Sequence, residues 1–299
     1  MINIPLTAMG HQPYGEFVSC SVSFNGQISV LEVDQIPERI QGMFVSTITE
    51  ERTWYITLYG IKPHYARKIN IHDAYNFHKI QVIDNQHILL VGARSRFENG
   101  EGEKNAAIYT MDGRLVRRFT LGDGIEDVSV TEKGEIWVSY FDEGVFGNYD
   151  WQIPMGQNGL VKYDLYGNVL WEQNECCIFD CYTLNVDNAA SVWFYYYADF
   201  ELVHIKNSTF TRYEIPVEGM SCFAVCLPWI IADNGYQQSY SFSVFRQDGQ
   251  RFKKHDDIVF TQPGGRQIDP VFRKMRGKWI LVMTETELYY GEIAPSIFY

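Results

Sequence analysis

The chain has 299 residues, of which 46% are hydrophobic, so it can bury a large core. Its net charge of −12 argues against a nucleic-acid partner, because phosphate binding needs clustered Lys and Arg. No apolar run is long enough to cross a membrane, and the N-terminus lacks the charged and apolar segments of a signal peptide. We therefore expect a cytoplasmic protein with no membrane partner.

The first part of the chain predicts short β-strands joined by tight turns. Residues 3–8 predict one strand without a local partner. Two hairpins follow, and the first turns over Asn25 and Gly26, because glycine supplies the positive φ that a two-residue turn needs. The four strands of this unit are expected at residues 17–24, 28–33, 43–49 and 53–59.

Similar units recur along the rest of the chain. Residues 130–139 combine an apolar strand, a short polar turn and a second apolar strand, and residues 82–91 and 186–194 repeat this pattern at intervals of about 50 residues. A second half-repeat, a hairpin with glycine in its turn, follows at residues 108–116, 161–170 and 243–252. Each complete unit therefore has four strands.

The remaining strands follow from these repeats in chain order. We expect them near residues 78–84, 87–93, 105–110 and 115–121; 126–131, 135–141, 159–164 and 169–174; 180–187, 191–197, 201–207 and 209–216; a fifth unit over 220–257; and a last unit of three strands at 270–276, 278–284 and 287–293.

Four-stranded antiparallel units at this period predict an all-β fold, a six-bladed β-propeller that forms one domain over residues 1–299. The last unit lacks one strand and the N-terminus has one strand too many. We therefore expect residues 3–8 to pair with the strand at 288–293, which closes the ring and removes exposed sheet edges.

The long connections are expected on one face of the propeller. They are residues 60–76, 94–104, 142–158 and 257–266, and each joins either the second strand to the third or one blade to the next. Loops held by a rigid scaffold commonly carry function, so this long-loop face is the predicted working face.

Acidic residues recur on that face at the start of the first strand of several blades. They are Glu126 and Asp127, Asp180 and Asp269, and His78 has the matching place in the second blade. Converging carboxylates of Asp127, Asp180 and Asp269 can hold Ca²⁺ or Mg²⁺, which prefer oxygen ligands. The alternative is that each Asp accepts a hydrogen bond within its own turn.

Two kinds of partner fit this face. A small molecule or ion would bind at the channel mouth, with Arg94, Arg96, Asp142 and Glu143 as the wall of the site. A protein or peptide would instead use exposed aromatic side chains, for which Phe146, Tyr149 and Trp151 are the candidates. No complete catalytic constellation is present in the sequence, which favours binding without catalysis, and whether the chain is an enzyme stays open.

The repeats resemble those of six-bladed propellers of the broad NHL and gluconolactonase-like kind. Residues 122–125, 137–147 and 180–186 also resemble a group of bacterial propellers with no assigned function. The gluconolactonase-like enzymes hold a divalent metal on the channel axis with Glu, Asn and Asp side chains. The resemblance therefore implies a hydrolase as a further alternative, although no residue of this chain is assigned to that metal set.

Overall fold

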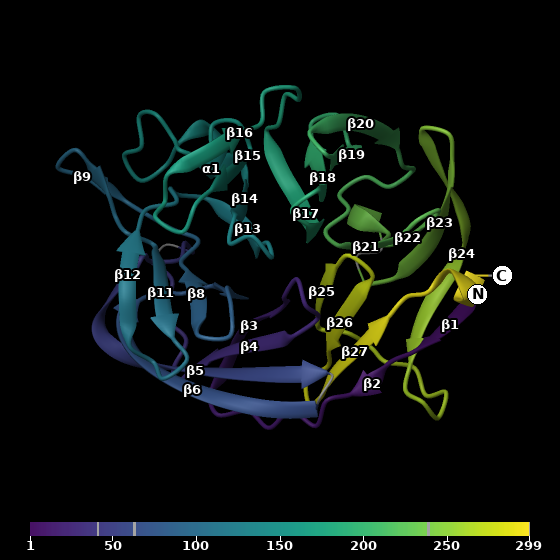
Figure 1. Cartoon of the computed structure of the whole chain (residues 1–299), viewed down its shortest axis with the longest axis horizontal. Helices are drawn as coiled ribbons and strands as arrows, with labels where there is room; N and C mark the ends of the chain where they lie inside the picture. The colour runs from purple at the N-terminus through teal and green to yellow at the C-terminus, as the bar shows by residue number, and fades with distance from the viewer. Residues whose placement is uncertain (41, 62–63, 238–239, 299) are drawn as a thin grey trace. The chain divides into compact units, whose positions relative to one another are not determined.

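The computed structural model describes residues 1–40, 42–61, 64–237 and 240–298, and its regular structure is almost entirely β-strand (Figure 1). The chain forms two compact units. The N-terminal unit is Pro13–Cys181, and the C-terminal unit is Tyr182–Tyr299 together with Met1–Gln12. Within the described residues, no helix has both the length and the apolar character that a membrane span requires.

The N-terminal unit contains three four-stranded antiparallel sheets, with the orders β3-β4-β5-β6, β7-β8-β11-β12 and β13-β14-β15-β16. Its elements are β3 (Glu16–Val22), β4 (Ile28–Val33), β5 (Thr47–Ile61), β6 (His64–Tyr75), β7 (Lys79–Val82), β8 (His87–Val91), β9 (Phe97–Glu98), β10 (Glu101–Gly102), β11 (Ala106–Thr110), β12 (Leu115–Phe119), β13 (Ile125–Val130), β14 (Ile136–Tyr140), α1 (Asp142–Phe146), β15 (Leu160–Tyr163) and β16 (Val169–Glu172).

The C-terminal unit contains one further four-stranded sheet, β2-β27-β26-β25, and a nine-stranded sheet. Its elements are β1 (Ile2–Pro5), β2 (Thr7–Ala8), β17 (Asp180–Asn188, whose first two residues belong to the N-terminal unit), β18 (Ser191–Tyr197), β19 (Glu201–Lys206), β20 (Thr209–Glu214), β21 (Phe223–Cys226), β22 (Trp229–Asp233), the 3₁₀ turn η1 (Gly235–Gln237), β23 (Phe242–Asp248), β24 (Arg251–Thr261), β25 (Phe272–Arg276), β26 (Trp279–Met283), β27 (Leu288–Glu292) and the 3₁₀ turn η2 (Pro295–Phe298).

The prediction of six separate blades is not confirmed by the sheets. Among the described residues, four sheets have four strands each, while β17–β20 and β21–β24 share the nine-stranded sheet. One parallel residue pair, Glu214 with Arg251, joins the two halves of that sheet.

The prediction for the first four-stranded unit is wrong in its second half. From residue 47 onward, the expected hairpin of residues 43–49 and 53–59 is one strand, β5. The expected connection at 60–76 is mostly the fourth strand, β6. In β6, apolar residues such as Ile69 and Ile71 alternate with charged and polar ones, and an outer strand with one solvated face shows this pattern. Pro63, which the prediction placed in that connection, lies outside the described residues.

The N-terminal segment splits between two partners. Thr7 and Ala8 pair with Tyr290 and Tyr289 of β27, which agrees with the predicted closure. Residues 2–5 do not follow them, because β1 runs parallel to β24 and pairs there instead. Leu6, between the two strands, is fully buried.

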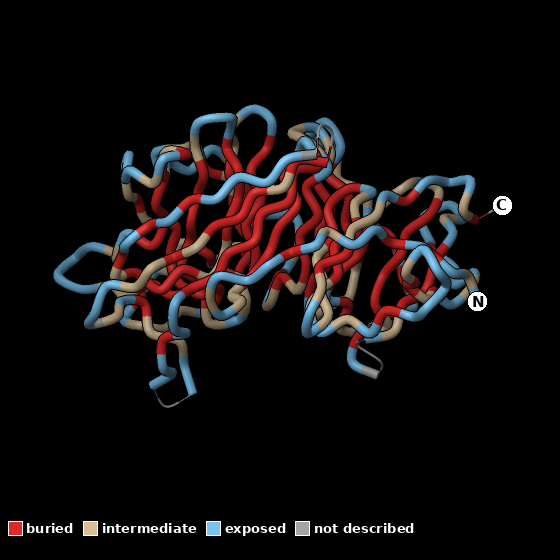
Figure 2. The backbone as a smooth tube through the Cα atoms, turned by 90° about the horizontal axis from the view of Figure 1, so that it is seen from below, coloured by how far each residue is buried: buried red, intermediate tan, exposed pale blue. Residues whose placement is uncertain are grey.

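The tight turns and the core agree with the repeat pattern. Gly113 and Gly167 have φ values of 84° and 86°, the left-handed conformation that the predicted hairpin turns require. The inner strands are largely buried and the connections are mostly exposed (Figure 2). Large apolar clusters fill the space between neighbouring sheets within each unit.

Three connections of the N-terminal unit leave the same edge of its sheets, because each joins a second strand to a third. They are residues 34–46, 92–105 and 141–159, and the first was not predicted to be long. The second contains the β9–β10 hairpin and the third begins with α1. The segment at 257–266, expected to be a loop, is strand as far as Thr261.

Candidate functional site

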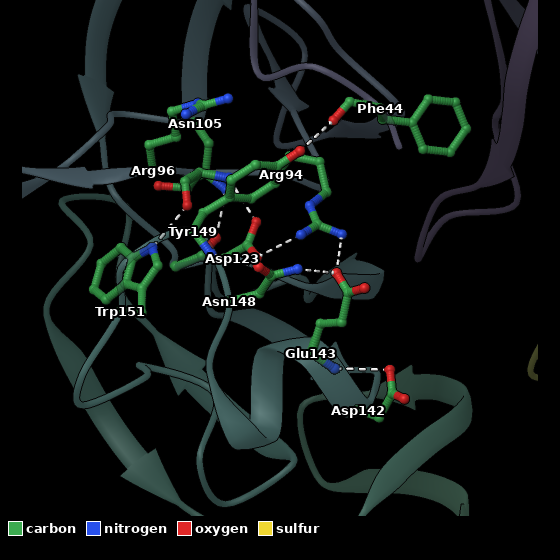
Figure 3. Close-up of polar contacts among 12 residues, drawn as sticks. Phe44, Arg94, Arg96, Asn105, Asp123, Asp142, Glu143, Asn148, Tyr149 and Trp151 are labelled. Atoms are coloured by element: carbon green, nitrogen blue, oxygen red, sulfur yellow. Dashed lines mark hydrogen bonds and ion pairs between the residues drawn. The ribbon is translucent and has the colours of Figure 1, made fainter. Parts of the chain in front are cut away.

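The three connections of the N-terminal unit hold one another through buried hydrogen bonds. The Tyr149 hydroxyl donates to the Phe44 carbonyl at 3.1 Å, and the Trp151 indole donates to the Ser95 carbonyl at 2.7 Å (Figure 3). The Phe97 N–H also donates to the Tyr149 carbonyl at 2.9 Å. These bonds fix the loops in place, and the loops carry the four charged residues that were predicted as a wall: Arg94, Arg96, Asp142 and Glu143.

Arg94 lies at the centre of these loops and is only 5% exposed. Its guanidinium donates to Asp123 Oδ2 at 2.9 Å and also to Glu143 Oε2 (Figure 3). The Ser95 N–H donates to the other oxygen of Asp123 at 2.8 Å, and Asn148 donates to Glu143 at 2.7 Å. We call Arg94, Asp123, Glu143, Asn148 and Tyr149 the Arg94 cluster.

The two carboxylates of the Arg94 cluster respond differently to their surroundings. Burial raises the pKa of Asp123 to about 6, although the charge of Arg94 and the hydrogen bond from Ser95 oppose this rise. Burial also acts to raise the pKa of Glu143, but the hydrogen bonds from Asn148 and Arg94 outweigh it and lower the pKa. An Arg placed between two carboxylates thus compensates much of the charge that the loops bury.

Tyr149 completes the cluster with its ring. The guanidinium carbons of Arg94 and Arg96 lie 4.4 and 4.7 Å from its centroid, which is cation–π geometry. Three of the four residues predicted as a wall are therefore connected. Arg94 pairs with Glu143 and shares the Tyr149 ring with Arg96. Asp123 was not predicted, although it stands between Gly122 and Gly124, both with positive φ, and this pattern marks a tight turn.

Of the three aromatic side chains predicted for protein binding, only that of Phe146 is largely exposed to solvent. Trp151 is buried, so its expected exposure is wrong. Tyr149 is half-buried, and its hydroxyl is bound to the Phe44 carbonyl. Phe146 is 64% exposed and its ring lies 5.4 Å from that of Phe179, which is also exposed.

Three acidic residues form a second charged region, which we call the Asp180 corner. They are Glu126 of β13, Asp142 at the start of α1 and Asp180 at the start of β17. The pKa of Asp180 is raised to about 7, first by burial and then by the negative charges of Glu126 and Asp142. A hydrogen bond from the Asp142 backbone opposes this rise only partly. Of the acidic residues expected to converge, Glu126 and Asp180 are near enough for their charges to interact, and Asp142, which was expected in the wall, joins them.

Asp127 and Asp269, the other two carboxylates predicted to hold a cation, each accept a hydrogen bond from a residue near in sequence. The Asp127 carboxylate is buried and accepts the N–H of the next residue, Val128, at 2.8 Å. Asp269 belongs to the C-terminal unit, is exposed, and accepts a hydrogen bond from Gln267 at 2.9 Å. Asp127 lies within strand β13, and the partner of Asp269 is a side chain, so neither bond is the backbone bond of a turn that the alternative describes.

His78 lies beside the Phe44 ring, with centroids 4.7 Å apart and the rings edge to face. Its Nδ1 accepts the Ala93 N–H at 3.1 Å, so the proton of the neutral ring is on Nε2. Burial, followed by the charge of Lys79, lowers the pKa of His78 to about 3. Among the described residues, Nε2 is buried without a hydrogen-bond partner. His78 is therefore a neutral donor and not an acid–base group near pH 7.

A metal site of the gluconolactonase-like kind does not fit these positions. Within the described part of the chain, no three His, Cys, Asp or Glu side chains are grouped so that they could hold a metal ion.

Comparison with known proteins establishes the class of fold. Two solved structures of virginiamycin B lyase from Staphylococcus aureus resemble the chain, each with a TM-score of 0.52. The selenomethionine-substituted structure shares 10% identity and covers 95% of this chain and 96% of its own. The catalytically inactive variant with quinupristin shares 11% identity and covers 97% and 98%. This chain is accordingly an all-β β-propeller, and identity this low says nothing about its activity.

At the level of families, the similarity is partial. A family model described as the YxzG family matches residues 154–290, slightly less than half of the chain. A search of curated proteins found no match.

Proposed function

We propose that this propeller is a binding protein that holds a small ligand with a positively charged group at the Asp180 corner. The observation that carries the proposal is the position of Asp180, at the start of β17 and directly after the exposed ring of Phe179. Burial raises the pKa of Asp180, and the charges of Glu126 and Asp142 raise it further. Carboxylates that lie close together in a partly desolvated site repel one another. Binding of a proton or of a cation reduces this repulsion. At neutral pH a cationic ligand would displace the proton from Asp180.

The aromatic pair beside this corner suggests the rest of the ligand. Phe179 directly precedes Asp180, and Phe146 ends the short helix α1 that Asp142 begins. Both rings are exposed and in contact, so they offer an apolar surface next to the carboxylates. An organic cation with an apolar body would contact both the carboxylates and the aromatic rings. Ca²⁺ or Mg²⁺ would contact only the carboxylates.

The proposal is tested by thermal unfolding with added cations. Ethylammonium, benzylammonium, CaCl₂ and MgCl₂ are each compared with NaCl at equal ionic strength, at pH 8 and at pH 5.5. We expect benzylammonium to raise the melting temperature at pH 8 beyond the NaCl control, and to do so less at pH 5.5, because Asp180 is then protonated. The effect should be absent in Asp180→Asn and retained in Glu51→Gln, an exposed carboxylate on β5. A shift that persists in Asp180→Asn, or no shift at pH 8 with any cation, would overturn the proposal.

We also propose that the propeller has six blades and lies in the cytoplasm. In support of six blades, β17–β20 and β21–β24 each repeat the antiparallel order of the four separate sheets. The one residue pair that joins them is at their outermost strands. An experimental density map in which the two halves of this sheet form one continuous blade would contradict this count.

A further inference from the structure

The C-terminal unit has a pocket whose lining shares no residue with the Asp180 corner. Its volume is about 650 Å³, within the range of small-molecule sites. Three connections contribute to its lining: residues 199–200 before β19, residues 215–218 after β20, and Asn234 and Tyr236 after β22. We call it the Phe200 pocket.

Aromatic rings form one wall of the Phe200 pocket. Phe200 meets Tyr236 edge to face, with centroids 6.1 Å apart, and meets Tyr197 in the same way at 5.4 Å. The ring of Tyr195 is stacked on that of Phe200, with centroids 6.1 Å apart. Phe200 has a φ of 55°, which is unfavourable for an aromatic residue, so the packing of these rings holds it there.

The two sides of the pocket are held together by the backbone. The Tyr236 N–H donates to the Glu218 carbonyl at 3.0 Å, which joins the second connection to the third. Gly219 allows this approach, because a Cβ there would lie 2.3 Å from the Tyr236 ring. The wall is therefore formed before any ligand binds, which lowers the entropic cost of binding.

The charge of the pocket is negative. Its lining contains Asp199, Glu201, Glu214 and Glu218 and no Lys or Arg among the described residues. Arginines outside the lining pair with two of these carboxylates, Arg212 with Glu201 at 3.4 Å and Arg251 with Glu214 at 2.8 Å. Asp199 and Glu218 have no such ion pair within the described part of the chain, and both are exposed. The charge of Glu218 also helps to raise the pKa of the Tyr195 hydroxyl, after burial, which is the larger cause.

From this combination we propose that the Phe200 pocket binds a small organic ammonium ion. The cationic head lies between Glu218, Asp199 and the faces of Phe200 and Tyr236, and its apolar substituents contact Val217 and Pro216 at the base. Aromatic rings and carboxylates together favour an alkylated ammonium over a metal ion, because rings attract a weakly hydrated cation and supply no oxygen ligand. An anion is excluded by the charge of the lining, and a neutral ligand of the same shape would leave the carboxylates uncompensated.

The test uses choline and its neutral isostere 3,3-dimethyl-1-butanol, titrated calorimetrically into the full chain. The titrations are made with Asp180→Asn at pH 6, so that the Asp180 corner makes no contribution and failure of one site does not affect the test of the other. We expect choline to bind and the isostere to bind at least about tenfold more weakly, since only the charge differs. Glu218→Gln and Tyr236→Leu should each weaken choline binding about 5- to 30-fold, the loss of one cation contact.

Glu51→Gln, far from the pocket lining in sequence and exposed on β5, is the matched control for loss of one negative charge. It should bind choline as the parent does. Because Tyr236 is largely exposed, folding of its variant can be checked by an unchanged melting temperature. The proposal would be overturned by equal binding of choline and its isostere, or by unchanged choline affinity in Glu218→Gln. It would also be overturned if no choline binding is detected at about 10 mM, tenfold above a dissociation constant of about 1 mM.

Discussion

Asp142 and Glu143 are neighbours in the chain but belong to opposite electrostatic environments. Glu143 turns toward Arg94, where the hydrogen bonds from Asn148 and Arg94 outweigh its burial and lower its pKa. Asp142 instead adds its charge to that of Glu126 and raises the pKa of Asp180, after the effect of burial. The Arg94 cluster is thus a compensated group of charges and the Asp180 corner is one that repels.

The difference between the Arg94 cluster and the Asp180 corner separates charges that stabilise the structure from charges that can bind a ligand. Buried charges are tolerated when they are paired and hydrogen-bonded, as in the Arg94 cluster, and pairing of this kind holds loops together. Like charges kept close together reduce stability, and strongly shifted pKa values of this kind cluster at functional sites. We therefore place the structural role in the Arg94 cluster and the binding role in the Asp180 corner.

The largest expected effect is the loss of the compensated cluster. Arg94→Met leaves Asp123 and Glu143 without their cation and should lower the free energy of unfolding by about 3–5 kcal/mol. Urea denaturation at pH 7 measures this change. Arg96→Met, which removes a cation from the other contact with Tyr149, serves as the control and should cost about 1 kcal/mol or less. Equal losses in the two variants would show that the cluster has no special role.

The neighbouring pair offers a sharper version of the comparison. Glu143→Gln weakens the bond to Arg94 and should destabilise the protein by about 1–2 kcal/mol. Asp142→Asn relieves repulsion at Asp180 and should be neutral or slightly stabilising at pH 8. Denaturation curves of both variants in one buffer give the sign of each change in the free energy of unfolding. Destabilisation of the same size in both variants would contradict the distinction between the Arg94 cluster and the Asp180 corner.

A smaller effect is expected in the pH dependence of stability. The pKa of Asp180 is about 7 in the folded protein against an ordinary value of 3.8, so the folded state binds the proton more tightly. Its contribution to the free energy of unfolding therefore falls as the pH rises from 4 to 7 and stays at its lowest above 7. Because His78 titrates in the same range, with the opposite sign, the quantity to measure is the difference between the parent chain and Asp180→Asn. A difference that does not change between pH 4.5 and pH 8 would speak against the raised pKa.

The sequence predicted most strands from residue 78 onward, because their apolar alternation and glycine turns are local signals. It missed the short β9–β10 hairpin and the end of β24. It failed at β6, whose charged outer face resembles a loop, and at β1, whose parallel partner depends on tertiary packing. At the site, the approach of Glu126 and Asp180 followed from equivalent positions in successive repeats. The pairing of Arg94 with Asp123 did not, because it depends on how irregular loops place side chains that are distant in the chain.

The most direct test of the account is the pKa of the Asp180 carboxyl group itself. It can be followed by carbon-detected NMR of the side chain between pH 3 and pH 9, in the parent chain and in Asp142→Asn. The account predicts a pKa of about 7 in the parent, from burial and the two neighbouring carboxylates, and a lower value when Asp142 is neutralised. A pKa near the ordinary value of 3.8, or one that Asp142→Asn leaves unchanged, would contradict it.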